Sequence, residues 1–288
     1  MFDNILKIDV NKAKQQKKKE ILVIEPAVVD HCNLNCAYCD HLSPLAKEGY
    51  YDVNQFEKDF SVLSKVLSSD YILNKYDIII QLVGGEPFLH PKLLDFADIV
   101  FKYINPEILK SFVIITNGTL FHKRMDLAEK HRQLYKKYGK PGIVISKYPI
   151  VSENYIRKTF AEYVGNPDIR ASIEDRNTFN KVNLDFNSKE LTAYCSDNCM
   201  CLRNGKLFKC PISGNIHFLM EKLNSNLEVI KPEDYLDLTK PLTPKIFDNF
   251  HQRPRNFCYY CKRRNYNTPW KKSEQDPQEW LSKEINNV

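Results

Sequence analysis

Long apolar runs are missing from this chain of 288 residues. A helix that spans a bilayer needs about 20 consecutive apolar residues, and stretches such as Ile78 to Ile80 are far shorter. The N-terminus also lacks the charged start and apolar stretch that mark a secretory signal. We therefore expect a cytoplasmic protein with no membrane-bound part.

Glycine is scarce as well, with nine in the whole chain, and two of them stand side by side as Gly84 and Gly85. The nine cysteines are an odd number, and a reducing cytosol disfavours disulfides, so metal binding is the expected use of their thiols. The rest of the composition, 43% hydrophobic and 27% charged with a net charge of +6, is that of an ordinary globular protein.

Three of the cysteines, Cys32, Cys36 and Cys39, form a C-x3-C-x2-C array, and no fourth cysteine lies nearby. Three thiolates can hold three irons of a four-iron cluster and leave the fourth iron open to a small molecule. A zinc loop or a group of buried thiols is the alternative, although structural zinc usually takes four ligands.

Apolar and amphipathic segments then alternate in the way that parallel βαβ units require. Helices are predicted to begin at Asn54, with Glu57 completing a capping box, and at Pro91, and to cover residues 123–138 and 153–164. Buried strands are predicted at residues 21–29, 76–83, 112–116, 142–146 and 169–173, with a candidate sixth at 182–186. The fold class is therefore α/β with a parallel sheet.

Further motifs follow the predicted strands in order. The second strand runs into Gly84-Gly85-Glu86-Pro87, the third ends at Thr116-Asn117-Gly118, and the fourth ends at Ser146. The carboxyl ends of parallel strands form one rim, where barrel enzymes place their active sites, so these residues and Cys32 are expected to lie together. With Tyr38 just before the third cysteine, the chain resembles the radical S-adenosylmethionine (radical SAM) enzymes over roughly residues 20–190.

That resemblance implies a partial (β/α)6 barrel, with a 4Fe-4S cluster on Cys32, Cys36 and Cys39 whose open iron chelates S-adenosylmethionine. It also implies an electron donor such as a flavodoxin or ferredoxin, and a 5′-deoxyadenosyl radical that abstracts hydrogen from a substrate. It assigns no catalytic base. The residues that it implies for cofactor binding are Tyr38, Gly84, Gly85, Glu86, Asn117 and Ser146.

A second group of cysteines lies beyond residue 190, where the alternation stops: Cys195, Cys199, Cys201, Cys210, Cys258 and Cys261. Asn204-Gly205 predicts a type I′ hairpin in which residue 203 faces 206, 201 faces 208 and 199 faces 210. Two cysteine pairs suit zinc, but beside a radical SAM barrel they resemble the twitch form of an auxiliary 4Fe-4S domain. Cys210, Cys258 and Cys261 are then ligands, with Cys199 as the expected fourth and Cys201 or Cys195 as alternatives.

We therefore expect a lead-in at residues 1–20, a barrel at 21–190, and a small auxiliary-cluster domain with its tail at 191–288. The last segment carries seven Lys or Arg and no Asp or Glu between Arg253 and Lys272. Arginine and lysine are the usual partners of phosphate. The arginines predicted to bind an anionic substrate are Arg253, Arg255, Arg263 and Arg264, and a solvated surface is the alternative.

The predicted reaction is hydrogen abstraction from a hydroxylated carbon of a sugar-like, phosphorylated small molecule, ending in oxidation, dehydration or epimerisation. The Asp40-His41-Leu42-Ser43-Pro44 sequence adds a resemblance to radical SAM proteins of carbohydrate or antibiotic pathways. A peptide maturase is the second hypothesis. A non-catalytic iron or zinc protein that binds nucleic acid through its basic end is the third, and the Gly-Gly-Glu-Pro turn argues against it.

Overall fold

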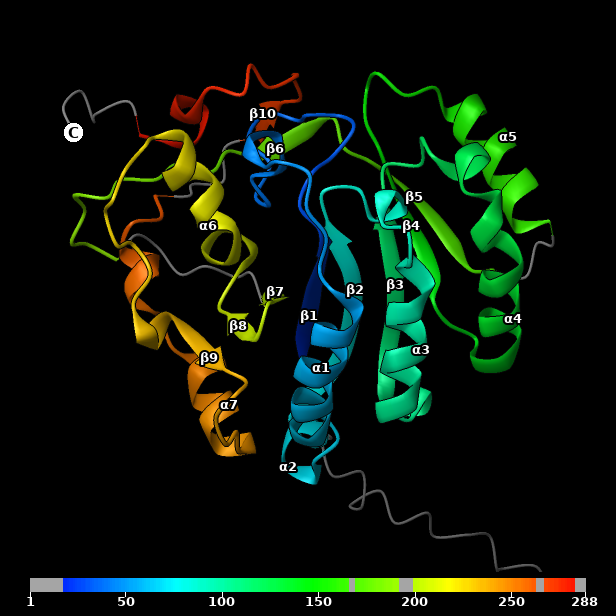
Figure 1. Ribbon diagram of the computed structural model, residues 1–288, viewed down its shortest axis with the longest axis horizontal. Helices are drawn as coiled ribbons and strands as arrows, with labels where there is room; N and C mark the ends of the chain where they lie inside the picture. The colour runs from blue at the N-terminus through cyan, green and yellow to red at the C-terminus, as the bar shows by residue number, and fades with distance from the viewer. Residues whose placement is uncertain (1–17, 166–168, 192–198, 263–266, 283–288) are drawn as a thin grey trace, which may run out of the picture.

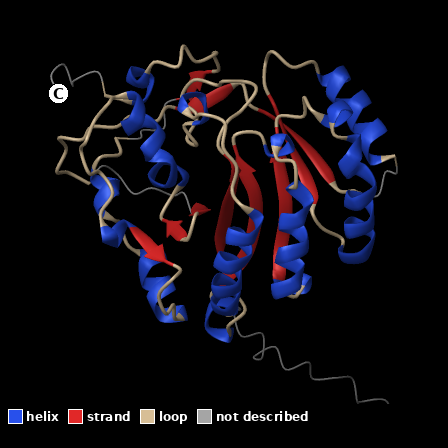
Figure 2. Cartoon of the chain, viewed as in Figure 1, coloured by secondary structure: helices blue, strands red, loops and turns tan. Residues whose placement is uncertain are grey.

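The structure of the protein is a computed structural model that describes residues 18–165, 169–191, 199–262 and 267–282. Cys195, Arg263, Arg264 and most of the predicted lead-in at residues 1–20 lie outside the described residues. Figure 1 shows a central sheet with helices packed beside it, and Figure 2 shows the same view coloured by type of structure.

Eight strands of the described residues form this sheet, in the order β5-β4-β3-β2-β1-β7-β8-β9. Strands β1 to β5 and β7 pair in parallel with one another, while β8 pairs antiparallel with both β7 and β9. This is the α/β partial barrel that the sequence predicts. The strands are β1 Glu20–Val29, β2 Tyr76–Gly84, β3 Leu109–Thr116, β4 Gly142–Lys147, β5 Ala171–Asp175, β7 Cys199–Arg203, β8 Lys206–Phe208 and β9 Tyr235–Asp237.

Helices connect the parallel strands and continue into the C-terminal part of the chain (Figure 1). No helix in the described ranges is both long and apolar enough to cross a bilayer. The helices are α1 Val53–Leu67, α2 Asp70–Leu73, α3 Leu93–Tyr103, α4 Ala128–Tyr138, α5 Glu153–Val164, α6 Pro211–Lys222 and α7 Pro244–Gln252.

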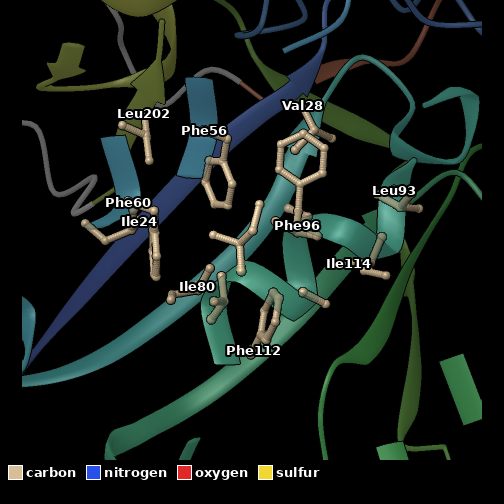
Figure 3. Packing of buried hydrophobic residues seen from close by; sticks show 14 of the residues in the cluster. Ile24, Val28, Phe56, Phe60, Ile80, Leu93, Phe96, Phe112, Ile114 and Leu202 are labelled. Carbon is tan, nitrogen blue, oxygen red and sulfur yellow. The ribbon is translucent and has the colours of Figure 1, made fainter. Parts of the chain in front are cut away.

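The main core lies between the sheet and these helices. Phe56 and Phe60, one turn apart on α1, are fully buried with ring centroids 5.3 Å apart, and Phe96 of α3 lies 4.8 Å from Phe56. Figure 3 shows these rings in one cluster with Ile24 of β1 and Ile80 of β2. This packing holds the strands side by side, so that their carboxyl ends open at one edge of the sheet.

The first helix begins one residue earlier than predicted. Helix α1 starts at Val53 rather than Asn54, because Asp52 caps it by accepting a hydrogen bond from the Gln55 backbone N–H at 2.8 Å. A carboxylate just before a helix satisfies an N–H that has no partner within the helix. The predicted capping box between Asn54 and Glu57 is therefore wrong.

Two other helix starts also differ. Helix α3 begins at Leu93 rather than Pro91, since the Lys92 N–H is taken by His90 Nδ1 at 2.9 Å. Helix α4, predicted from residue 123, begins at Ala128 after two short 3-10 turns. Helix α5, predicted at residues 153–164, is confirmed.

The sixth strand predicted at residues 182–186 is wrong. Leu184 is buried, as a strand residue would be, but its backbone N–H bonds to the Trp280 carbonyl at 2.9 Å in the C-terminal part of the chain. Strand β7 lies beside β1 instead, and a short strand β6 (Thr178–Asn180) pairs antiparallel with β10 (Asn267–Pro269) outside the main sheet. Alternation of buried residues identifies an extended segment but not its pairing partner.

The predicted hairpin between β7 and β8 is confirmed, with residue 203 facing 206 and 201 facing 208. Asn204 and Gly205 have φ angles of 44° and 79°, as a type I′ turn requires. The predicted facing of 199 and 210 falls beyond β8, which ends at Phe208. Because β7 pairs with β1, this hairpin extends the barrel sheet.

Candidate functional site

The cysteine loop leaves β1 and packs directly against the turn that leaves β2. The Gly85 N–H donates to the Val29 carbonyl at 2.7 Å, and the Glu86 N–H donates to the His31 carbonyl at 3.1 Å. A Cβ on Gly85 would lie 1.8 Å from the His31 oxygen, and one on Gly84, whose φ is 133°, would lie 2.1 Å from the Val29 oxygen. The paired glycines thus allow a backbone approach that no other residue permits.

Glu86 joins this turn to the end of β3. Its Oε1 accepts hydrogen bonds from the Phe88 N–H at 3.0 Å and the Thr116 hydroxyl at 2.7 Å, and its Oε2 accepts one from the Asn117 N–H at 2.8 Å. Burial raises the pKa of Glu86 to about 7, against the effect of these three donors. A carboxylate offers about four acceptor positions, so one on Oε2 is left for a ligand.

The Thr-Asn-Gly turn also reaches the cysteine loop. The Asn117 side-chain amide donates to Asn33 Oδ1 at 2.8 Å and lies 3.8 Å from the Cys32 sulfur. Asn33 in turn donates to the Thr119 hydroxyl at 2.8 Å. The ends of three adjacent strands, β1, β2 and β3, are therefore held together by side chains that the sequence places after each strand.

One cavity of about 550 Å³ opens at this edge of the sheet. Every residue predicted to bind the barrel cluster or S-adenosylmethionine lines it. These residues are Cys32, Cys36, Tyr38, Cys39, Gly84, Gly85, Glu86, Asn117 and Ser146. A more open hollow of about 780 Å³ lies along α6, and its lining contains none of the predicted site residues. We therefore assign the chemistry to the smaller cavity.

The three thiols of the loop suit a cluster. Burial raises the pKa of Cys32 to about 12 and that of Cys36 to about 11, and it raises the pKa of Cys39 further, with Cys36 and Cys32 adding to the effect. Thiolates in such surroundings need a positive charge beside them, which irons supply. Among the described residues no three Cys, His or acidic side chains lie close enough to share a single ion; a four-iron cluster needs one thiolate for each of three irons.

The sequence motifs do not identify several residues that line the cavity. Tyr148 and Phe179 stack with ring centroids 6.0 Å apart and nearly parallel planes, and Arg176 pairs with Glu174 at 2.7 Å. None of these has a local motif. Glu25 also lines the cavity, and it could have been noticed as a carboxylate inside the apolar segment 21–29.

The second cysteine group converges in part. The pKa of Cys210 is raised by burial first, and then by the charges of Cys261 and Cys258, so these three thiols lie within electrostatic reach. Cys210 also caps α6, where its sulfur accepts the Ser213 N–H at 3.4 Å. Cys210, Cys258 and Cys261 therefore lie in the same region of the fold, and their role as ligands of an auxiliary cluster stays a prediction.

Cys201 lies in a different setting. It is fully buried beside Ala27 and Phe208, and a Cβ on Gly214 would lie 2.6 Å from its sulfur. After burial, the charges that act on its pKa belong to Arg203 and three carboxylates rather than to other cysteines. Cys199 is half-buried, two residues earlier on β7, and its ligand role stays a prediction.

The two described arginines of the basic segment are not among the residues that line the cavity. Arg253 is exposed. The Arg255 guanidinium donates to the Asn249 carbonyl at 2.9 Å and lies 4.2 Å from the centre of the Phe250 ring, so it closes the end of α7. Their role in substrate binding stays untested, and the described geometry gives Arg255 a structural one.

No family model matches the chain, but sequence relatives do. TigE of Paramaledivibacter caminithermalis, a radical SAM cyclopropyl synthase, is 30% identical over 146 residues, which are 48% of this chain and 29% of TigE. The subtilosin biosynthesis protein AlbA of Bacillus subtilis is 29% identical over 103 residues, 35% of this chain and 20% of AlbA. GTP 3′,8-cyclase 1 of Mycobacterium tuberculosis is 28% identical over 104 residues, 35% of this chain and 26% of the cyclase. The chain thus spans less than a third of the length of these relatives.

Two solved structures are similar at lower identity. BtrN in complex with AdoMet and 2-DOIA aligns with 85% of this chain and 94% of its own, with 18% identity and a TM-score of 0.46. anSMEcpe with bound AdoMet and a Cp18Cys peptide aligns with 56% of this chain and 44% of its own, with 20% identity and a TM-score of 0.33. The site at the mouth of a parallel α/β sheet agrees with these sequence relatives, and the chain is similar to enzymes of the radical SAM superfamily.

Proposed function

We propose that this protein is an enzyme that binds a 4Fe-4S cluster through Cys32, Cys36 and Cys39 and cleaves S-adenosylmethionine reductively. The observation that supports this is the single cavity where those thiols meet Glu86 and Asn117. When bound, the cluster and S-adenosylmethionine supply a 5′-deoxyadenosyl radical that abstracts hydrogen from the substrate. A one-electron donor such as a flavodoxin or ferredoxin starts each cycle.

The residues around the cavity have separate tasks in this proposal. The free acceptor position on Glu86 Oε2 takes the cofactor's ammonium group, and the backbone of Gly84 and Gly85 approaches it closely. Tyr38, Asn117 and Ser146 line the rest of the cofactor's place. The network on Glu86 holds the carboxylate before the cofactor arrives, so little ordering remains to be done on binding.

The substrate in this proposal is a hydroxylated, sugar-like small molecule. Ser43, only 3% exposed, lines the cavity, and its hydroxyl has no hydrogen-bond partner among the described residues. His41 lines the same wall, and its Nδ1 is also buried and likewise lacks a partner in the described ranges; burial lowers the pKa of His41. Buried polar atoms are nearly always paired. We infer that substrate hydroxyls pair with these two.

Charge in the cavity favours a substrate without phosphate. Of the described lining residues, Arg176 is the one Arg or Lys, and it is already paired with Glu174. Carboxylates of Glu25, Asp40 and Asp175 line the same cavity. A phosphate there would face more negative than positive groups, so a neutral or amine-bearing polyol fits better than the phosphorylated one that the basic segment suggested.

Replacing Ser43 with Ala tests this assignment. Because the hydroxyl has no partner, we expect the melting temperature of the cluster-loaded protein to stay unchanged or to rise by about 1–2 °C. Binding of polyol probes should weaken about tenfold, the loss of one hydrogen bond. The measurements are calorimetry and titration with glucose and scyllo-inositol in neutral, amino and phosphorylated forms.

Ser273→Ala is the matched control, since Ser273 is 5% exposed but its hydroxyl oxygen accepts the Gln275 N–H at 2.9 Å. That variant should melt about 2 °C lower. A Ser43→Ala protein that melts as low as the control contradicts the assignment. Wild-type protein that binds only the phosphorylated forms restores the phosphate hypothesis.

Peptide maturation is the second candidate function. It is supported by the name of AlbA, a protein of bacteriocin biosynthesis, although the match covers 20% of that protein. Wild-type protein that cleaves S-adenosylmethionine but binds none of the polyol probes favours this candidate.

We further propose that residues 191–288 form an auxiliary domain with a second 4Fe-4S cluster on Cys199, Cys210, Cys258 and Cys261. The electrostatic proximity of the last three supports it. Replacing Cys258 and Cys261 together with Ala should remove about four irons per chain and keep slow, uncoupled cleavage of S-adenosylmethionine, because the barrel site is built from other strands. Iron and sulfide analysis is the measurement. Unchanged iron contradicts the second cluster, and loss of zinc instead assigns a structural metal.

A further inference from the structure

A short C-terminal segment lies across the cysteine loop. The Ala37 N–H donates to the Lys271 carbonyl at 3.0 Å, and the Ser273 N–H donates to the Asn35 carbonyl at 2.8 Å. Cys36 itself forms an antiparallel bridge with Lys272. We call residues 270–273 the strap. It pairs with the backbone on both sides of the middle cysteine of the array, although more than two hundred residues of chain separate the two segments.

The first residue of the strap carries a buried donor without a partner. Trp270 Nε1 is buried and has no hydrogen-bond partner among the described residues. Its backbone is fixed by a hydrogen bond from the Trp270 N–H to the Asn177 carbonyl at 2.8 Å, and its ring lies 6.4 Å from that of Tyr148. An indole N–H can only donate, and buried donors are rarely left unpaired. The backbone at Trp270 is thus fixed, and its buried indole N–H has no acceptor among the described residues.

The strap lies against the backbone of Cys36, so sulfur at Cys36 is the candidate acceptor. An indole N–H beside a sulfur favours a negative charge on that sulfur. Cluster sulfurs bear such a charge. Hydrogen bonds to them are one of the means by which a protein sets the reduction potential of a cluster.

We propose that the Trp270 N–H donates a hydrogen bond to a sulfur of the cluster bound at Cys36 and so raises its reduction potential; this rests on the proposed function of the cysteine loop. The reduced cluster carries one more negative charge than the oxidised one. A fixed donor therefore stabilises the reduced form more. Through the strap, the reduction potential of the barrel cluster depends on the C-terminal part of the chain.

Replacing Trp270 with Phe keeps an aromatic ring and removes the N–H. In the reconstituted protein we expect the potential of the barrel cluster to fall, with the reduction equilibrium shifted about three- to tenfold, roughly 30–60 mV for one electron. Redox titration monitored by electron paramagnetic resonance measures this potential. The barrel cluster is identified as the one whose signal changes when S-adenosylmethionine is added. Iron content should stay the same.

The chain's other tryptophan provides the matched control. Trp280 is fully buried, and its Nε1 donates at 2.9 Å to the backbone carbonyl of Cys39 rather than to sulfur. Trp280→Phe should lower the melting temperature and shift the reduction equilibrium less than twofold. A Trp270→Phe protein with full iron whose equilibrium also shifts less than twofold overturns the inference.

A second measurement applies even if Trp270→Phe fails to fold. Protein that carries Trp280→Phe and ¹⁵N-labelled tryptophan should show a nitrogen coupling in the pulsed resonance spectrum of its reduced barrel cluster, because Trp270 is then the one labelled residue. Absence of that coupling also overturns the inference. Wild-type protein that takes up no cluster, or does not cleave S-adenosylmethionine, contradicts the proposed function instead.

Discussion

Replacing Cys32, Cys36 and Cys39 together with Ala should abolish the formation of 5′-deoxyadenosine and remove about four irons per chain. The three thiols line the cavity that holds Glu86 and Asn117, and the loop offers the one open iron expected to bind S-adenosylmethionine. The measurements are iron and sulfide analysis and chromatography of the products under a strong reductant. No other described group is positioned to bind this cluster. The loss of 5′-deoxyadenosine formation should therefore be complete rather than partial.

Cys201→Ala is the matched control, because Cys201 is as buried as any described cysteine and packs against Gly214 outside the loop. Its removal should cost some stability, about 1–2 kcal/mol, and leave both the barrel cluster and the cleavage in place. If the triple variant still cleaves S-adenosylmethionine, the loop is not the cofactor site and the central proposal is wrong.

Replacing Gly85 with Ala should be the most damaging single substitution at the site. The new Cβ would lie 1.8 Å from the His31 carbonyl oxygen, 2.2 Å from its carbon and 2.9 Å from the Cys32 nitrogen. All three are backbone atoms of the cysteine loop, which therefore has to move. We expect a loss of roughly 3 kcal/mol in the free energy of unfolding and a cluster that no longer binds S-adenosylmethionine.

Gly139→Ala separates this steric effect from the general cost of replacing glycine. Gly139 ends α4 with a φ of 65°, and nothing lies within 4 Å of a Cβ added there. Its substitution should cost about 1–2 kcal/mol through the left-handed backbone alone and leave cofactor binding intact. Denaturant unfolding and titration with S-adenosylmethionine measure both properties. A Gly85→Ala protein that behaves like Gly139→Ala contradicts the described approach of the two loops.

Much of the site could be predicted from the sequence because its parts are local. The turns after β1, β2 and β3 each carry a short motif, and the parallel order of strands then brings them to one edge. The sequence predicts helix α5 at its observed bounds, since Ser152 caps its start and Gly165 ends it in a left-handed conformation. The hairpin at Asn204-Gly205 followed from its turn residues alone.

Other features depended on contacts between distant parts of the chain. The phosphate hypothesis rested on a count of cations, yet Arg255 closes α7 and no described residue of that segment lines the cavity, whose lining carries more acidic than basic groups. The sequence indicates the acceptors on Glu86, but only the fold shows that three donors already occupy most of them. Composition counts charges; the fold determines which of them face each other.

The sequence by itself therefore determined the α/β class, the order of the motifs and the thiols that lie at the strand ends, because helical period, strand alternation and turn chemistry act between near neighbours in the chain. Only the tertiary structure decided the partners of extended segments. Residues around Leu184 pair with the C-terminal part instead of the barrel, β7 takes the place beside β1, and the strap covers the cysteine loop. Any extended backbone offers the same donors and acceptors to any other, so the choice rests on how the whole chain buries its side chains.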